Sequence, residues 1–154
     1  MATIVQEVPV NKPGQAPLSR EDVWGALEIK ARNAPRFVKA IDTCVVLEEG
    51  DNWLTREITG MGERHIERVT FTPQRVVRFD RSEGNTTGYI TNEIQDTDSG
   101  LVLRFRIELT RNDLEAGSEE ERAYFEGIRA AYVDAVESTL EATRVLLSDV
   151  KKTG

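Results

Sequence analysis

From residue 43 onward, hydrophobic residues recur at every second position, which is typical of β-strands with one buried face. Connections of a few residues, rich in Gly, Asp, Asn or Pro, separate the alternating segments. Neighbouring strands joined by such short links run antiparallel, because a parallel pair needs a long crossover. The pattern therefore predicts a meander of six strands, over residues 43–49, 53–59, 64–72, 75–81, 87–95 and 101–109.

The residues before this meander predict one more strand and two helices. Residues 4–11 alternate weakly, as expected of a first strand. Ser19 followed by Asp22 is the capping-box arrangement that begins a helix, and Pro35 ends that helix. A second, shorter helix is expected over residues 35–41.

The residues after the meander, 118–152, predict one long helix of roughly 50 Å. Its apolar stripe at helical spacing most often marks a helix that packs on a core. We expect the half of the stripe near Phe125 and Tyr132 to depart from plain core packing. The stripe consists of Phe125, Ile128, Tyr132, Ala135, Thr139, Thr143, Leu146 and Val150.

A sheet with one apolar face needs a cover, and the long C-terminal helix is the natural one. The predicted fold is therefore α+β, a helix-grip fold in which a curved seven-stranded antiparallel sheet wraps around the C-terminal helix. Two short helices lie between strands 1 and 2. At 154 residues, the chain is expected to form a single domain over residues 1–154.

One hairpin, "LTREITGMGERHIERVTF", carries charge on the face that should be buried. Centring its turn on "GMGE" sets Arg56 opposite Glu67 and leaves His65 nearer the turn. Followed across the next turns, the same face brings Glu67 near Arg81 and includes Asn92. This register puts the apolar residues of all four hairpins on one side, whereas a shift of one residue would expose them.

Buried charges must be paired, hydrated or bound to a ligand, so these inward residues have two interpretations. In the first, Arg56 and Glu67 form a cross-strand ion pair. His65 then lies at a solvated rim, and Asn92 bonds to neighbouring backbone. In the second, all four line a pocket, because one ion pair leaves donors and lone pairs for water or a ligand to satisfy. The apolar side of that pocket would consist of Phe71, Val77, Phe105, Phe125 and Tyr132.

Composition narrows the range of partners. With a net charge of −7 and no Lys/Arg cluster, binding to nucleic acid or to an anionic membrane is not expected. One cysteine and one histidine make no Cys/His set for zinc, and no carboxylate spacing indicates another metal, so we expect no metal and no cofactor. No apolar run reaches the roughly 20 residues of a membrane helix, and the first residues lack a signal-peptide pattern. A cytoplasmic protein is the expectation.

Three stretches, "VNKPGQAPLSREDVWGALEIKARNAPRFV", "LTREITGMGERHIERVTF" and "GYITNEI", resemble the AtaL-like family within the SRPBCC or START-like superfamily. The namesake of that family belongs to a fungal acetylaranotin biosynthesis cluster. The resemblance implies a cavity between the sheet and the C-terminal helix for a small apolar or amphipathic molecule, and a link to secondary metabolism. It supplies no agreed catalytic residues.

Three classes of function remain open at this point, of which ligand binding or carriage is the first hypothesis. An aromatic or acyl compound would place a carboxylate or hydroxyl against Arg56. The second is an enzyme of the cyclase or isomerase kind, with Glu67 or His65 as general base. The third is an adaptor that acts through its surface. A homodimer would use the outward-facing Trp53 and Tyr89.

Overall fold

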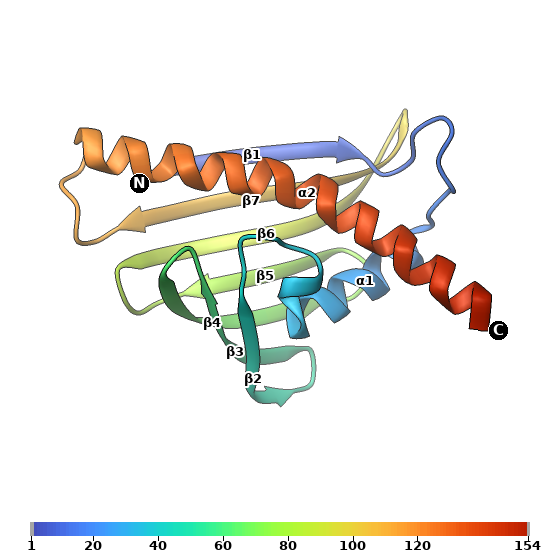
Figure 1. The fold of residues 1–154 in the computed structure, drawn as a ribbon, viewed down its shortest axis with the longest axis horizontal. Helices are drawn as coiled ribbons and strands as arrows, with labels where there is room; N and C mark the ends of the chain where they lie inside the picture. The colour runs from blue at the N-terminus through green and yellow to red at the C-terminus, as the bar shows by residue number, and fades with distance from the viewer. Residues whose placement is uncertain (1, 154) are drawn as a thin grey trace.

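The computed structural model describes residues 2–153, and the side chains of residues 2–148. Its elements follow the predicted order of one strand, two short helices, six strands and one long helix (Figure 1). They are β1 Ala2–Pro9, α1 Arg20–Arg32, the 3₁₀-helix η1 Ala34–Arg36, β2 Thr43–Gly50, β3 Trp53–Gly60, β4 Glu63–Thr72, β5 Val76–Arg81, β6 Thr86–Thr97, β7 Gly100–Arg111 and α2 Glu119–Thr153.

The second short helix is present, but its expected bounds of residues 35–41 are wrong, because η1 is a single 3₁₀ turn over Ala34–Arg36. After η1 the chain makes only isolated turns, with the backbone N–H of Ile41 donating to the carbonyl of Val38, before it joins the sheet at Asp42. The backbone N–H of Asp42 donates to the carbonyl of Thr59 at 2.7 Å. Residues 37–41 therefore form an irregular loop beside the end of β3.

The sheet has seven antiparallel strands in the order β1-β7-β6-β5-β4-β3-β2, which leaves β1 and β2 at its edges. The predicted register is confirmed: Arg56 pairs with Glu67, and further pairs continue it across the sheet. These are Val69 with Phe79, Val77 with Asn92, and Asn92 with Phe105. The face that carries these residues is buried, so the predicted assignment of the two faces also holds.

Helix α2 runs diagonally across the β1–β7 side of the sheet and reaches α1 with its C-terminal half (Figure 1). Ala135, Val136 and Leu140 of α2 are buried in the core. The hydroxyls of Thr139 and Thr143 bond within the helix, to carbonyls one turn earlier at 2.7 Å. Val150, the last residue of the predicted stripe, lies outside the described side chains. The arrangement is the predicted helix-grip fold, with the sheet curved around the helix.

Helix α1 covers the other half of the concave face. Ser19 and Asp22 form the predicted capping box, in which each side chain accepts the backbone N–H of the other. Trp24 of α1 packs edge-on against Phe71 of β4, with ring centroids 6.3 Å apart. No helix within residues 2–153 combines the length and the apolar character needed to cross a bilayer.

Candidate functional site

Three charged side chains meet beneath the helices on the concave face of the sheet. Both Nε and Nη2 of Arg56 donate to Oε1 of Glu67, at 2.9 and 2.8 Å. The other carboxylate oxygen, Oε2, accepts from Nε of Arg81 at 2.7 Å. All three residues are buried, Glu67 completely. We call this group the ion cluster.

The sequence suggested that the remaining donors of Arg56 and the second carboxylate oxygen of Glu67 need water or a ligand. In the structure, the end of α1 and Arg81 satisfy them instead. Nη1 of Arg56 donates to the carbonyls of Ala31 at 3.0 Å and Lys30 at 3.4 Å, which are orphan acceptors in the last turn of the helix. A positive charge is favourable there because the helix dipole is negative at its C-terminus. The expected cross-strand ion pair is therefore present, and Arg81 occupies the remaining carboxylate oxygen.

The ion cluster keeps Glu67 ionised. Burial acts to raise the pKa of its carboxyl group, but the charges and hydrogen bonds of Arg56 and Arg81 outweigh burial and lower the pKa to about 2. A carboxylate held by two arginines has both oxygens occupied and little affinity for a proton. Glu67 is therefore unsuited to act as a general base.

Lys30 of α1 also points into the interior. Its Nζ donates to Oδ1 of Asn92 at 2.6 Å and lies 5.1 and 4.9 Å from the ring centroids of Phe79 and Phe105. Burial, and then the charge of Arg56, lower the pKa of this amine to about 7. Nδ2 of Asn92 is buried without an acceptor among the described residues.

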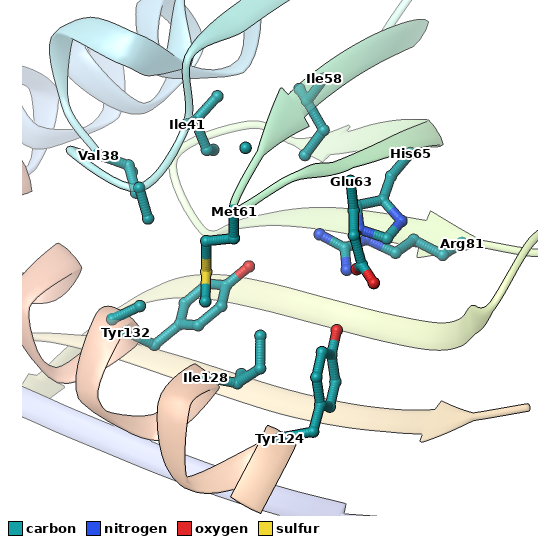
Figure 2. Close-up of a pocket in the computed structure, with 13 residues that line it drawn as sticks. Val38, Ile41, Ile58, Met61, Glu63, His65, Arg81, Tyr124, Ile128 and Tyr132 are labelled. Atoms are coloured by element: carbon teal, nitrogen blue, oxygen red, sulfur yellow. Dashed lines mark ion pairs between the residues drawn. The ribbon is translucent and has the colours of Figure 1, made fainter. Parts of the chain in front are cut away.

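A pocket of about 220 Å³ opens between the β3–β4 hairpin, the loop after η1 and the N-terminal half of α2 (Figure 2). Most of its wall is apolar, and polar groups converge on one side of it. The apolar part of the lining consists of Val38, Ala40, Ile41, Ile58, Gly60, Met61, Ile128 and Ala131. The polar part consists of Glu63, His65, Arg81, Tyr124 and Tyr132.

The backbone around the hairpin turn shapes one wall of the pocket. A Cβ atom on Gly60 would lie 2.2 Å from the carbonyl oxygen of Ala40, so only glycine lets the loop approach the end of β3 this closely. Met61, in the turn itself, has a φ of +53° and is half exposed. Figure 2 shows its side chain reaching across the opening toward Tyr132.

The polar groups differ in how firmly the protein holds them. Glu63 is bound by Arg111, and its Oε2 lies 3.4 Å from Nε2 of His65. Burial, and then the charge of Arg81, lower the pKa of His65, so the imidazole is neutral at pH 7. Burial raises the pKa of the Tyr132 hydroxyl, and the charge of Arg81 only partly offsets this effect, so the hydroxyl keeps its proton.

Comparison with known proteins identifies the family. The sequence profile of the family described as AtaL, acetylaranotin biosynthesis cluster protein L, matches residues 4–149. The chain belongs to the AtaL family. No curated protein gave a significant match in sequence.

Solved structures with the same fold include biosynthetic proteins. The Zhui aromatase/cyclase from Streptomyces sp. R1128 has a TM-score of 0.66 at 22% identity, covering 94% of this chain and 95% of its own. A protein from Thermus thermophilus has a TM-score of 0.68 at 15% identity, covering 92% and 94%. The di-domain ARO/CYC StfQ from the steffimycin biosynthetic pathway has a TM-score of 0.66 at 15% identity, covering 97% of this chain. This chain spans only about half of StfQ, 52% of its length. At these identities the likeness shows the fold alone.

In this AtaL-family protein, two of the nine residues predicted for the site line the pocket: His65 and Tyr132. Three others, Arg56, Glu67 and Asn92, belong to the buried polar groups behind it. The remaining four lie in the hydrophobic core instead: Phe71, Val77, Phe105 and Phe125. Phe125 faces β1, where it lines a different hollow with Ile4.

Sequence reasoning left Arg81 out of the site, although the signal was present. Arg81 follows Val77 and Phe79 at the strand period of two, so it had to share their inward face. Ile128 and Tyr132 are one helical turn apart and mark the side of α2 that faces the pocket. By contrast, the loop residues Val38 and Ile41 carry no periodic signal that could have placed them.

Proposed function

We propose that this AtaL-family protein binds a small apolar or amphipathic compound in the pocket between the β3–β4 hairpin and α2. The observation that carries the proposal is the pocket itself, a hollow with an apolar wall on which a few polar groups converge. That combination is typical of small-molecule sites, because apolar contact supplies affinity and the polar groups fix orientation.

Two further observations support this function. Ile58 and Ile128 face each other across the pocket from the sheet and from the helix (Figure 2), so a flat apolar ligand would contact both. The volume of about 220 Å³ lies below the roughly 300–1,000 Å³ of pockets for drug-sized ligands. We therefore infer a compound of one or two rings. The aromatase/cyclases named above share the fold, and aromatic compounds of this kind are consistent with it.

Calorimetric titration with 2-naphthamide, a neutral two-ring compound, tests the proposal. Ala131 lines the pocket, and Ala131→Trp would fill it, so binding should be lost. Val133, on the same helix, is exposed and outside the pocket, so Val133→Trp is the matched control and should bind as the wild type does. If all three proteins bound the probe equally, the probe would lie elsewhere, and the proposal would be wrong.

A second candidate function, acid–base catalysis, is favoured by His65. Its neutral imidazole faces the pocket beside a protonated tyrosine hydroxyl and a fixed guanidinium. A neutral imidazole can remove an acidic C–H proton, and the donors could stabilise the enolate oxygen that forms. Glu67, the other base considered from the sequence, has no such role, since two arginines hold its carboxylate.

Hydrogen–deuterium exchange separates this candidate from simple binding. 2-Tetralone is a small enolisable ketone, and its exchange in D₂O can be followed by NMR. The wild type should accelerate the exchange well above the buffer rate, and His65→Gln should not. Acceleration that persisted in His65→Gln would remove His65 as the base, and no acceleration by the wild type would leave binding as the function.

A further inference from the structure

Arg81 is held on one side only. Its Nε is fixed by Glu67 at 2.7 Å, and its side chain is 5% exposed. Among residues 2–148, no carboxylate or carbonyl accepts a hydrogen bond from either terminal Nη atom, and the neighbour that contacts the Arg81 side chain from α2 is the neutral hydroxyl of Tyr132. Figure 2 shows the guanidinium end of the side chain pointing inward among the residues that line the pocket. The two Nη atoms are thus fixed in direction, and on the pocket side they meet no charged acceptor among the described residues.

The charges around Arg81 leave it without full compensation. Two buried arginines, Arg56 and Arg81, share the single carboxylate of Glu67. Arg56 directs its other donors to the carbonyls at the end of α1, whereas Arg81 has no such partner among the described residues on its free side. A buried cation with an unsatisfied side is unfavourable, and an anion placed there would offset that penalty.

The other groups that face Arg81 do not take this role. Glu63 is the one acid in the described lining, and Arg111 of β7 already binds it. His65 is neutral at pH 7, and its pKa is lowered in part by Arg81 itself. The Tyr132 hydroxyl from α2 forms a hydrogen bond with the Arg81 side chain, but it is neutral. None of them supplies a negative charge to the Nη atoms.

We propose that the compound bound in this pocket carries a carboxylate, which the two Nη atoms of Arg81 bind while the apolar rings lie against Ile58 and Ile128. This inference rests on the proposed function, because it names the class of ligand for the same pocket. Guanidinium suits the role since its planar fork matches a carboxylate with two parallel hydrogen bonds. Arg81, rather than the Arg56 expected from the sequence, is the residue that meets the charged end.

The test compares two probes of one shape, 2-naphthoate and neutral 2-naphthamide, by calorimetric titration at pH 8. The wild type should bind the carboxylate at least about tenfold more tightly than the amide. Arg81→Gln should remove that preference and leave the affinity for the amide within about threefold. Arg64→Gln is the matched control, because it removes the same charge from an exposed position on β4 and should leave both affinities unchanged.

Each outcome has a distinct meaning. Amide binding that is blocked by Ala131→Trp, but without preference for the carboxylate, overturns the anion proposal and keeps the proposed function. A carboxylate preference that survives in Arg81→Gln overturns the role of Arg81. If neither probe binds, the anion proposal and the proposed function are both wrong. Should Arg81→Gln not fold, Arg81→Lys keeps the charge without the planar fork, and an unchanged preference there contradicts paired hydrogen bonding.

Discussion

Arg81 donates its Nε to Glu67 at 2.7 Å, and this contact joins the pocket to the buried ion cluster behind it. Glu67 in turn accepts two hydrogen bonds from Arg56, which is bound to the end of α1. The orientation of a pocket donor is thereby fixed by α1, the helix that covers the other half of the same concave face. Such support from behind limits the rotamers of Arg81 and prepares it for a ligand.

Glu67→Gln should destabilise the protein strongly. Removing the shared charge leaves two buried arginines without compensation, and breaking a buried pair costs about 3–5 kcal/mol. Urea denaturation would measure this as a lower free energy of unfolding. Glu57→Gln is the matched control, because Glu57 pairs with Arg64 at 2.6 Å on the exposed face of the same hairpin and should change stability little. Equal effects of the two substitutions would contradict the importance of the ion cluster.

The same carboxylate should make the protein sensitive to acid in a defined range of pH. The pKa of Glu67 is about 2 in the folded state and near 4.5 when unfolded, so the unfolded chain binds the proton first as pH falls. The stability due to ionised Glu67 is complete above pH 4.5 and is lost as pH falls toward 2. This loss amounts to about 3 kcal/mol. Unfolding free energies of the wild type should converge on those of Glu67→Gln over this range; parallel curves would argue against the lowered pKa.

Lys30 should give a second rise of stability with pH, in a higher range. Its pKa is about 7 when folded against 10.5 when unfolded, so the unfolded chain holds an extra proton between these values. Stability therefore rises with pH across this range, by about 2 kcal/mol from pH 7 to pH 9. Lys30→Met should abolish the rise, whereas Lys39→Met, at an exposed position, should retain it. A rise that persisted in Lys30→Met would show that another group is responsible.

The register of the sheet could be predicted because two constraints agree. Short turns fix which residues face each other, and a shift of one residue would expose a whole apolar set. Arg56 and Glu67 were therefore correctly placed opposite each other and inside. The same logic made their ion pair one of the two interpretations, since strand pairing alone brings these two side chains together.

The pocket depends on arrangements that have no local signal. Tyr124 lines it, but the adjacent Phe125 faces β1, and only the rotation of α2 against the sheet decides between them. The loop after η1 forms another wall because Gly60 admits it closely, which is a contact between residues distant in sequence. Lys30 was assigned to a helix, but nothing in the helical pattern indicated that its amine would end over two phenylalanine rings.

Met61 connects stability with binding at the mouth of the pocket. Its φ of +53° is unfavourable for a long side chain, and Asn tolerates this region better. Met61→Asn should therefore raise the free energy of unfolding by about 0.5–1 kcal/mol. It also removes an apolar wall, so 2-naphthamide should bind several-fold more weakly. Gln74→Asn is the matched control, since Gln74 has a φ of +65° in a turn away from the pocket. This control should stabilise the protein similarly without changing the affinity. Weaker binding in both variants would show that the loss of affinity does not come from removing the Met61 side chain from the pocket wall.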